Sequence, residues 1–501
     1  MVNIVTQLEH LYDETQVVVR DTARSLTRGQ LTATCQQLAK QLERRNIRTL
    51  ALHADNGLDW IVIDLACQLA NICILPLPTF FSISQLQHAL SETPVDAVIS
   101  DNPAVPDLFP QVKHRETLSE ILPGSNHLQL LLMEMSDTPA LLPQQTGKIT
   151  YTSGSTGSPK GVCLSNYQLL EQASVLANAV ALKHPRHLCL LPLSTLLENV
   201  AGVYTPIMAS GEVIAPSLRE LGFCGSSSVD ASIMTSVISR YQPDSLILTP
   251  QLLLLLVNAA SKGWQAPSSL RFVAVGGSRV SPALLSQAWQ AGIPAYEGYG
   301  LSECASVVSL NATRQHRPGS CGKPLPHLGV RIIDDEVVVT GNPMLGYVNE
   351  PSSWGNQAIY TGDLGYLDND GYLFINGRRK NLLISSYGRN INPEWIESEF
   401  LAHPVFAEFV VFGDAEPYCV ALLTPRQPGI SRRQLQAIID DINRSLPDYA
   451  RICQWAILPA PLTTDRSLIT DNGRPKRSAI QEHYRSLLDS LYHSGVEELS
   501  A

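Results

Sequence analysis

The sequence lacks paired cysteines. Its 10 cysteines are scattered singly, with no CxxC pair and no cysteine–histidine spacing typical of a metal site. This distribution argues against a disulfide-stapled secreted protein and predicts reduced thiols in a cytoplasmic protein. An excess of positive charge is missing too, because the 501-residue chain has a formal net charge of −10 at pH 7. A general nucleic-acid-binding protein needs a basic face, so no nucleic-acid partner is expected.

Long uninterrupted hydrophobic runs are also absent. The most apolar stretch, residues 58–78, is broken by Asp59, Asp64, Gln68 and Asn71. It therefore predicts a buried helix followed by a strand, and no transmembrane segment is expected. The N-terminus shows neither a basic region nor a small-residue cleavage site, so no signal peptide is expected either.

The composition is that of an ordinary globular protein, with 44% hydrophobic and 16% charged residues. A chain of 501 residues is too long for a single core, so two or three domains are expected. Helices and strands alternate in residues 1–145, which predicts a mainly parallel sheet covered on both faces. The expected helices there are 31–42, 59–69 and 83–90, and the expected strands are 49–53, 72–76 and 97–100.

The later part of the chain changes character. Residues 310–376 are rich in glycine, proline and short apolar strands, which predicts a small β unit. From residue 381 the pattern becomes a compact α+β one, and the polar basic run 377–381 marks the boundary. We therefore expect an α/β protein with a large N-terminal domain of α/β layers plus a small β unit, residues 1–379. A small α+β C-terminal domain, residues 380–501, follows it.

A run of small and hydroxyl-bearing residues, 151–161, reads Tyr-Thr-Ser-Gly-Ser-Thr-Gly-Ser-Pro-Lys-Gly. The flanking patterns predict one strand running into it and a short strand running out, with the next helix beginning near Ser165. Its glycines let backbone N–H groups turn inward, its hydroxyls add donors and Lys160 adds positive charge, which together suit a polyphosphate. It is not a P-loop, because no Gly-Lys-Ser/Thr follows at the required spacing. A flexible surface turn is the alternative.

Several other predicted strands end in glycine or in a carboxylate. A strand at 188–193 is followed by Glu198, which is either a site residue or a solvated carboxylate. A strand at 272–276 runs into Gly276-Gly277-Ser278, which either leaves room for a flat ligand or forms a tight turn. A further short strand precedes Glu303, a carboxylate that suits Mg²⁺ beside a phosphate site and otherwise lies on the surface.

Asp363 follows a glycine in the polar turn Tyr-Thr-Gly-Asp, residues 360–363. A carboxylate in such a place can accept two hydrogen bonds from a ribose diol, as the acidic residue does in other nucleotide sites. An Asx-turn is the alternative role for this side chain.

Four motifs together carry a family resemblance. They are 151–161, Gly-Tyr-Gly-Leu-Ser-Glu at 298–303, 360–363 and Gly-Arg-Arg-Lys-Asn at 377–381. In order and spacing, the sequence resembles the adenylate-forming superfamily of acyl-CoA synthetases, luciferases and peptide-synthetase adenylation domains, over essentially the full chain. Within that superfamily, residues 381–397 look most like those of the fatty acyl-CoA ligases.

The resemblance implies a reaction and its cofactors. A carboxylic acid, fatty or otherwise apolar, would be activated by ATP to an acyl-adenylate and then joined to a thiol, with release of AMP and pyrophosphate. The implied cofactors are ATP, Mg²⁺ and CoA, or a carrier-protein phosphopantetheine in place of CoA. The C-terminal domain would be mobile and would rotate between the two half-reactions.

The resemblance also implies the nucleotide site. The 151–161 loop would hold the β- and γ-phosphates, Tyr299 would stack on the adenine, and Asp363 with Arg378 would bind the ribose. The metal ligands would be Ser155 and Glu303. The expected ATP- and AMP-binding residues are Thr152, Ser153, Gly154, Ser155, Thr156, Gly157, Lys160, Gly276, Gly277, Ser278, Gly298, Tyr299, Gly300, Ser302, Asp363 and Arg378.

The remaining implied roles belong to the second domain. Lys380 would lie at the hinge, and the loop of Tyr387, Gly388 and Arg389 would line a tunnel for the pantetheine thiol. The expected catalytic residues are Arg474, Lys476, Glu303 and Lys380.

The sequence departs from the family at two informative places. Where the family has a lysine that contacts the carboxylate and the α-phosphate, the direct register puts Arg474, with Lys476 two residues on. Arginine keeps the charge but is planar and larger, so either Arg474 serves, Lys476 reaches in, or adenylation is slow. Thr195 replaces a histidine that many relatives carry near the acyl pocket, which leaves the identity of the acid open.

Three hypotheses for function follow. The first is an acid–CoA ligase whose partners are a small-molecule carboxylic acid, ATP and CoA. The second is a ligase that loads an acyl or aryl group onto a separate acyl carrier protein, since no carrier domain is evident in the sequence. The third is a non-catalytic nucleotide- or acyl-adenylate-binding protein, a hypothesis motivated by Arg474. Acid-dependent release of pyrophosphate and the choice of thiol acceptor separate the three.

Overall fold

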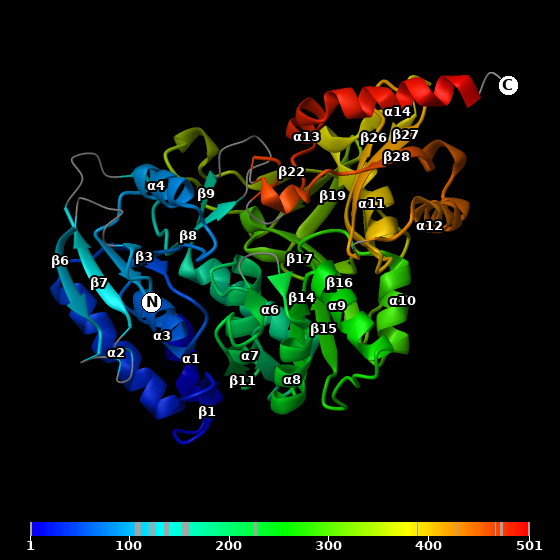
Figure 1. The fold of residues 1–501 in the computed structure, drawn as a ribbon. Helices are drawn as coiled ribbons and strands as arrows, with labels where there is room; N and C mark the ends of the chain where they lie inside the picture. Colours follow the sequence, from blue (N-terminus) through cyan, green and yellow to red (C-terminus); the bar gives the residue numbers. More distant parts are fainter. Residues whose placement is uncertain are drawn as a thin grey trace.

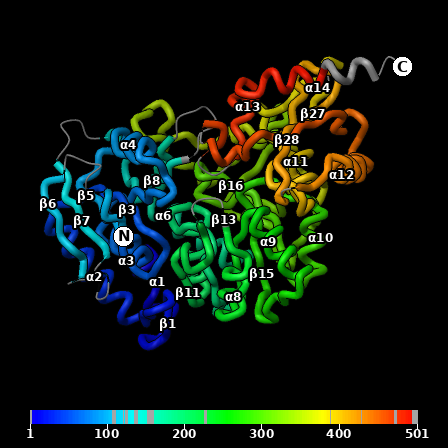
Figure 2. The backbone as a smooth tube through the Cα atoms, viewed as in Figure 1, coloured from blue at the N-terminus to red at the C-terminus, as the bar shows by residue number. Residues whose placement is uncertain are grey.

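The computed structural model of the chain has two large sheets, a small antiparallel sheet and a C-terminal α+β unit (Figure 1). The described residues are 3–105, 112–119, 122, 125, 127–134, 140–152, 160–224, 228–387, 389–427, 429–465, 467–470 and 474–498. The C-terminal unit, coloured yellow to red, rests on one end of the larger N-terminal body (Figure 2). The predicted fold class is confirmed, whereas the boundary between residues 379 and 380 stays a prediction.

The first large sheet carries the start of the chain. Its strands are β3 (Thr49–His53), β4 (Cys73–Pro76), β5 (Ala97–Ser100), β6 (Val112–Thr117), β7 (Gln129–Met133), β8 (Lys148–Thr152), β9 (Lys160–Leu164) and β21 (Gly346–Tyr347). They lie in the order β21-β9-β8-β4-β3-β5-β7-β6, and β3 pairs in parallel with both β4 and β5. Its helices are α1 (Ile4–Leu11), α2 (Arg28–Arg44), α3 (Leu58–Leu69) and α4 (Ile83–Glu92). The predicted alternation of helices and strands is therefore confirmed, but the sheet is parallel only from β8 through β4 and β3 to β5, and its outer strand pairs are antiparallel.

Helix α3 forms the first part of the apolar stretch 58–78, which is interrupted by Asp59, Asp64 and Gln68. Almost all of its residues are buried, and β4 follows it, as predicted. Among the described residues, none of the helices combines the length and the apolar character needed to cross a membrane.

The second large sheet begins at the N-terminus and then takes up the middle of the chain. Its strands are β1 (Val17–Arg20), β2 (Ser25–Thr27), β10 (Arg186–Leu188), β11 (Glu212–Ile214), β14 (Ser245–Leu248), β15 (Phe272–Val275), β16 (Ala295–Leu301), β17 (Ser306–Leu310) and β18 (Lys323–Pro324). The order is β18-β17-β16-β15-β14-β10-β11-β1-β2, with β14, β15 and β16 parallel to one another. Their carboxyl ends therefore meet at one edge, where ligands bind in such sheets.

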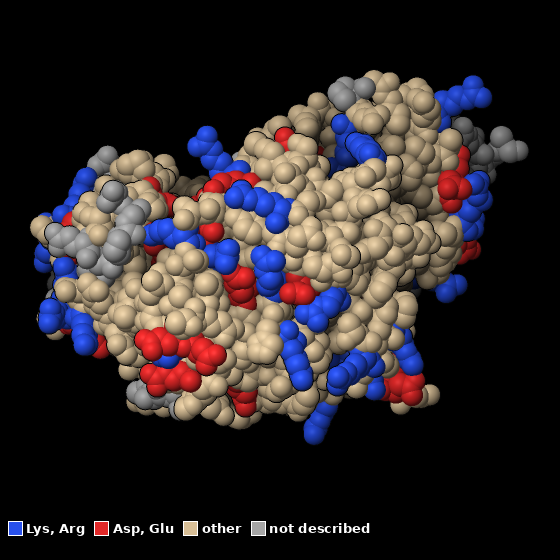
Figure 3. All heavy atoms as spheres, turned by 90° about the horizontal axis from the view of Figure 1, so that it is seen from below, with Lys and Arg blue, Asp and Glu red and all other residues tan. Residues whose placement is uncertain are grey.

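Helices and short elements surround this sheet. They are α6 (Asn166–Val180), the π-helix η1 (Glu198–Tyr204), α7 (Thr205–Met208), the small hairpin β12 (Phe223–Cys224) and β13 (Ser228–Val229), α8 (Ala231–Tyr241), α9 (Pro250–Ser261), α10 (Pro282–Gln290) and the short turn η2 (Ser302–Cys304). On the face drawn in Figure 3, Lys and Arg side chains are interspersed with Asp and Glu side chains rather than gathered in one basic field.

Strands β8 and β9 form an antiparallel hairpin in which Thr152 is the partner of Lys160. The Gly-rich motif therefore joins two strands, as predicted. The next helix, α6, begins at Asn166 because Ser165 caps it and Gln168 closes a reciprocal capping box. The capping pair predicted this start from the sequence alone.

The strand predicted at 188–193 is wrong beyond its first residue, because β10 ends at Leu188. Cys189 still donates its N–H to Ile214 of β11, and beyond it the segment bonds to a side chain. The amide of Asn56 donates to the carbonyl of Leu191 (2.8 Å) and accepts from the N–H of Leu193 (2.7 Å). An apolar run can thus leave a sheet when a distant amide satisfies its backbone groups.

The small β unit and the C-terminal unit follow the predicted pattern. The small sheet consists of β19 (Gly329–Ile333), β20 (Glu336–Thr340), β22 (Ala358–Leu367) and β23 (Leu373–Arg378), all antiparallel, with the turn η3 (Pro351–Ser353) beside it. The C-terminal unit contains η4 (Arg379–Asn381), β24 (Leu383–Ile384), β25 (Asn390–Ile391), α11 (Pro393–Leu401), β26 (Phe406–Phe412), β27 (Cys419–Pro425), α12 (Arg432–Ser445), η5 (Asp448–Ala450), β28 (Ile452–Ile457), η6 (Leu462–Thr464), α13 (Arg477–His483) and α14 (Arg485–Glu498). Its predicted hairpin is the antiparallel pair β26–β27.

A fully buried lysine ties the two large sheets together. Lys148 of β8 donates to Asp64 of α3 (2.7 Å) and to the hydroxyl of Tyr204 in η1 (2.8 Å), and also to Asn199. The side chains of Lys148 and Asp64 are each 1% exposed, so neither charge reaches water. Burial lowers the pKa of Lys148, and the nearby Asp64 opposes that change. Buried charges are tolerated only when paired in this way.

We expect Lys148→Met to destabilise the protein by about 3–5 kcal/mol, because it leaves Asp64 charged and unpaired in the core. The midpoint of urea unfolding measures the loss. A double variant that also carries Asp64→Leu should recover much of it, since no lone charge remains.

The control is Arg444→Ala, which breaks a surface pair with Asp441 whose side chains are 73% and 71% exposed. That variant should change the midpoint little, because exposed ion pairs contribute little to stability. A Lys148→Met midpoint no lower than that of the control contradicts a structural role for the buried pair.

Candidate active site

A cleft with a volume of about 2900 Å³ lies where the second large sheet, the small β unit and the C-terminal unit meet. It brings together most of the predicted site residues that the structure describes. Those that line it are Lys160, Gly276, Gly277, Ser278, Gly298, Tyr299, Gly300, Ser302, Glu303, Asp363, Arg378, Lys380, Arg474 and Lys476.

Some predicted residues lie elsewhere. Ser153, Gly154, Ser155, Thr156, Gly157 and Gly388 lie outside the described residues, as does the side chain of Thr152. Tyr387 is 78% exposed, and neither it nor Arg389 lines the cleft. The predicted thiol-tunnel loop therefore lies apart from the nucleotide residues in this structure.

The centre of the cleft is the buried carboxylate of Asp363. Tyr299 of β16 donates its hydroxyl to one oxygen (2.6 Å), and Arg378 of β23 lies 2.8 Å from the other through its Nε. Asp363 and Arg378 face each other across strands β22 and β23. Burial raises the pKa of Asp363, while Arg378 and the Tyr299 hydroxyl favour its charged form. The carboxylate thus bonds to two other strands, and its remaining lone pairs are available to a ligand.

Arg474 and Lys476 occupy different electrostatic surroundings. Arg474 is exposed to the cleft yet enclosed by protein around it, and this burial lowers its pKa. Arg474 lines the cleft, and the charges of Arg378, Glu394 and Asp363 act on its guanidinium. Lys476 lines the cleft as well, and its charge lowers the pKa of Asp465, a residue of the C-terminal unit.

Glu303, at the turn after β16, accepts a hydrogen bond from the Tyr347 hydroxyl at 3.0 Å. Its second oxygen makes no hydrogen bond within the part of the chain that the structure describes. The ammonium of Lys160 lies 4.7 Å from the centre of the Tyr347 ring and 2.9 Å from Glu350. A carboxylate with one oriented and one open oxygen fits a hard divalent cation such as Mg²⁺.

The glycines of the cleft serve two different structural roles. A Cβ on Gly300 would lie 1.8 Å from the carbonyl oxygen of Ser306, so only glycine allows the close approach of β16 and β17. Gly277 has φ +84° and open space around its Cα, and a Cβ on Gly276 would meet nothing closer than 3.7 Å. The turn after β15 is therefore tight and also leaves open space, so both alternatives given for residues 276–278, a tight turn and room for a flat ligand, apply.

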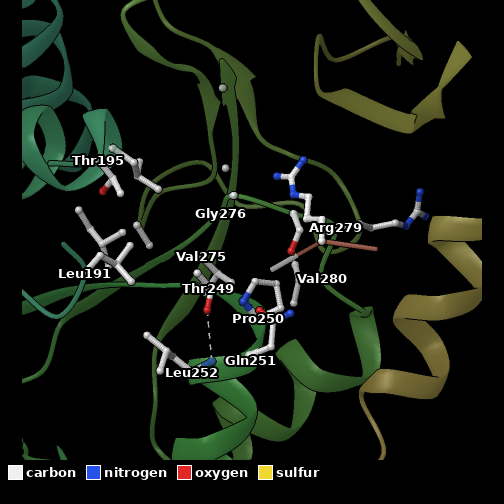
Figure 4. Close-up of a pocket in the computed structure, with 18 of the residues that line it drawn as sticks. Leu191, Thr195, Thr249, Pro250, Gln251, Leu252, Val275, Gly276, Arg279 and Val280 are labelled. Atoms are coloured by element: carbon white, nitrogen blue, oxygen red, sulfur yellow. Dashed lines mark hydrogen bonds between the residues drawn. The ribbon is translucent and has the colours of Figure 1, made fainter. Parts of the chain in front are cut away.

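The apolar side of the cleft carries the residues around Thr195. Figure 4 shows Leu191 and Thr195 on the opposite side of the cavity from Arg279 and Val280, with Gly276 between them. The hydroxyl of Thr249 accepts from the N–H of Leu252 at 3.4 Å and so caps α9. The first turn of that helix is fixed against the cavity wall.

For Glu198, the structure corrects one of the two alternatives given from the sequence, that of a solvated carboxylate. It is fully buried, so it is not a solvated carboxylate. Its Oε1 lies 3.2 Å from Nε2 of His187, and ligand atoms of His187, Cys189 and Glu198 all lie within 4.8 Å of one another. The sequence analysis missed this cluster, although His187 and Cys189 are two residues apart and so point to the same face of an extended segment.

Glu297 is a second titratable residue that the sequence analysis missed. It lies on β16 at the edge of the cleft, and its side chain accepts from the thiol of Cys321 at 3.8 Å. Burial raises the pKa of Glu297 to about 7, against the attraction of the Arg279 charge. Glu297 directly precedes the motif at 298–303, and this position could have marked it as a candidate. The motif does not, however, predict that the side chain is buried.

The pKa of Glu297 predicts how stability depends on pH. Because this pKa is raised from 4.5 to about 7 in the fold, the contribution of Glu297 to stability is present below pH 4.5 and is lost as pH rises through 7. Glu297→Gln, which mimics the neutral form, should therefore gain stability relative to wild type between about pH 5 and about pH 8, by up to roughly 3 kcal/mol.

Melting temperatures of wild type, Glu297→Gln and the exposed-site control Glu43→Gln at the two pH values measure this gain. The control should track wild type at both. An equal difference between wild type and Glu297→Gln at the two pH values contradicts the raised pKa.

The cleft thus gathers the residues predicted to hold a nucleotide, and comparison with known proteins identifies the family. The sequence profile of the AMP-binding enzyme family matches residues 6–348, and that of the AMP-binding enzyme C-terminal domain matches residues 380–495. The chain therefore belongs to the AMP-binding enzyme family. The predicted membership in an adenylate-forming superfamily akin to the acyl-CoA synthetases is confirmed, as is the predicted class of AMP-forming acid–thiol ligase.

Its relatives include CoA ligases for different acids. The long-chain-fatty-acid–CoA ligase FadD15 of Mycobacterium bovis is 23% identical over 571 residues, which cover 92% of each chain. The 2-succinylbenzoate–CoA ligase of Bacillus subtilis is 27% identical over 414 residues, covering 78% of this chain and 80% of the relative. The crystal structure of the anthranilate CoA ligase AuaEII with anthranoyl-AMP is 19% identical with a TM-score of 0.80, covering 99% of this chain and 98% of that one. At that identity the structural likeness shows the fold alone.

Proposed function

We propose that the protein joins an organic carboxylic acid to CoA in two steps, through an acyl-adenylate, with ATP as the activating nucleotide. The observation that carries the proposal is the meeting of Arg474, from the C-terminal unit, with Asp363 and Arg378 in one cleft. Membership in the AMP-binding enzyme family and the CoA-ligase relatives support the same reaction class.

The first step brings two anions together, since a carboxylate oxygen attacks the α-phosphorus of ATP and pyrophosphate leaves. Fixed positive charge at that point lowers the barrier most. We assign this role to Arg474, because its guanidinium stays charged despite the lowered pKa and lies in the field of Asp363 and Arg378. Lys160, at the end of the Gly-rich motif, adds charge on the side of the β- and γ-phosphates.

The nucleotide would be held by the carboxylate of Asp363. Its two oxygens already accept from Tyr299 and approach Arg378, which fixes their orientation before the ligand arrives. The free lone pairs would take the ribose hydroxyls, and the ring of Tyr299 would cover one face of the adenine. Gly276 and Gly277 would leave room for the other face of the adenine.

Glu303 would hold Mg²⁺, which when bound supplies charge neutralisation to the phosphates. Tyr347 keeps one Glu303 oxygen in place at 3.0 Å, so the other oxygen is presented in a fixed direction. Ser155 is the second ligand we propose.

The second step needs a different face of the C-terminal unit. Tyr387 and Arg389 are exposed and lie outside the cleft, while Arg474 lines it. We infer that this arrangement suits adenylation, and that rotation at Lys380 would bring the 387–389 loop to the adenylate for attack by the thiol. Lys380 lies in the short turn η4 directly after β23, between the two units.

Arg474→Ala should lower acid-dependent ATP–pyrophosphate exchange by about 10²–10³-fold, because it removes a cation from the transition state. Lys476→Ala is the comparison variant, since Lys476 lines the same cleft but is not among the charges that act most strongly on Asp363 or Arg474. It should retain exchange within about threefold of wild type.

The Arg474→Ala variant should still form thioester from a supplied acyl-adenylate, because the second step does not use that face. Equal losses in the two variants, or a loss confined to Lys476→Ala, contradict the role of Arg474.

The proposed reaction itself is tested by pyrophosphate release over a panel of aliphatic and aromatic acids, with and without CoA. Acid-dependent release, followed by CoA-dependent release of AMP, is the expected result. Release with transfer only to an acyl carrier protein selects the carrier-loading alternative. ATP binding without release for any acid leaves the non-catalytic alternative and overturns the proposal.

A further inference from the structure

The cleft does not end at the nucleotide residues. It continues beneath η1 along one face of the second large sheet, where Phe272 and Ala274 of β15, with Gly276 just after it, lie beside Ser245 of β14 and Thr249 just after that strand. Alternate residues of a strand face the same way, so these side chains form one continuous floor. From Ser245 to Thr249 the strand rises roughly 13 Å, so the lining residues Ser245 and Thr249 are separated by about that distance along the sheet.

Small residues keep the tunnel open. Ala274 lies in a central strand whose other residues are buried, yet Ala274 itself keeps exposed surface. Ala201 of η1 and Ala177 of α6 line the same space and are also only half-buried. A well-packed core would fill such positions with larger side chains. The space is therefore built to receive an elongated group.

The inner end of the tunnel is polar. His187 and Ser245, neighbours in the register of β10 and β14, both line it, and Nδ1 of His187 lies 2.9 Å from the Ser245 hydroxyl oxygen. Nε2 of the same ring faces Glu198 at 3.2 Å. The second oxygen of Glu198 has no hydrogen-bond partner within the described residues. Glu198 does not line the tunnel, whereas Ser245 does, so the Ser245 hydroxyl is the polar group of this cluster that a ligand could reach.

The helix above the cluster is shaped to accommodate it. A Cβ on Gly202 would lie 2.4 Å from Oε1 of Glu198 and 2.9 Å from Nε2 of His187, so only glycine permits the contact. Residues 198–204 form a π-helix, a rare conformation found often at functional sites. A purely apolar core would need neither the glycine at position 202 nor the π-helix.

We propose that the tunnel takes the acyl chain of a carboxylic acid whose far end carries a hydroxyl group, received by the Ser245 hydroxyl, which His187 orients. This inference rests on the proposed function, because the carboxylate end must lie at the strand ends near Gly276. Both ring nitrogens of His187 already have partners, so Ser245 meets the ligand. A ligand hydroxyl both donates and accepts, so it can bond to Ser245 whichever way the Ser245–His187 hydrogen bond runs. Glu198 acts as a positioning residue, since it fixes the ring without lining the tunnel.

The test compares each straight-chain acid with the ω-hydroxy acid of the same length over a ladder of lengths. At the best length, wild type should favour the hydroxy acid in kcat/KM by about tenfold, the value of one buried hydrogen bond that would otherwise be lost. In Ser245→Ala the preference should fall to about one.

A second buried serine–histidine pair offers a matched control. Ser100 and His53 lie 3.1 Å apart in the first large sheet, away from the cleft. Ser100→Ala removes the same atom from the same kind of contact and should keep the full preference. Equal kcat/KM for the two acids at every length in wild type overturns the proposal, as does a preference that survives Ser245→Ala.

Calorimetric binding of the two acids to the full chain separates this inference from the proposed function. If no acid is turned over but the hydroxy acid binds more tightly, and Ser245→Ala abolishes the difference, the tunnel assignment stands while the ligase proposal fails. One equivalent of tightly held metal that is lost in Cys189→Ser assigns the cluster to an ion and overturns the hydroxyl proposal, because His187, Cys189 and Glu198 offer three ligand atoms within 4.8 Å.

Discussion

The cleft depends on one buried carboxylate. Asp363 is 5% exposed, and an ionised carboxyl so far from water must be compensated by its neighbours. Those neighbours come from separate parts of the chain: Tyr299 from the second large sheet, Arg378 from the last strand before the hinge, and the field of Arg474 from the C-terminal unit. Because the charge of Asp363 is compensated by groups from three parts of the chain, the relative placement of those parts determines the geometry of the proposed nucleotide site. Movement of the C-terminal unit would change the surroundings of Asp363 and would therefore couple the position of that unit to the proposed binding of nucleotide.

A second buried charge sets the frame around this site. Lys148 bonds to α3 and to η1, so it joins the first large sheet to the helix that covers the tunnel. The Gly-rich motif begins three residues after Lys148, and η1, the helix above the tunnel, contains Asn199, which also accepts from Lys148. The proposed sites for phosphate and for the acyl chain are therefore anchored to one ion pair. Its disruption should disturb both, and a purely apolar core would not hold them in a fixed relation.

Much of this was predictable where the signal is local. The hairpin around the Gly-rich motif, the helix start at Ser165 and the antiparallel pair in the C-terminal unit follow from alternation and capping over a few residues. Long-range bonds were not predictable. The end of β10 depends on Asn56, 137 residues before Leu193, and the Tyr299 hydroxyl finds Asp363 64 residues away. The surroundings of Glu198 were not predictable either, because sequence periodicity does not distinguish a solvated carboxylate from one that is paired with a buried histidine.

The central claim is that this chain forms an acyl-adenylate, and the fate of the carboxylate oxygen tests it most directly. An acid labelled with ¹⁸O in its carboxylate is incubated with ATP and CoA, and the products are examined by mass spectrometry. If a carboxylate oxygen attacks the α-phosphorus and the thiol then displaces AMP, one labelled oxygen must appear in AMP and none in pyrophosphate. Thioester formed with unlabelled AMP, or with the label in inorganic phosphate, would contradict the account.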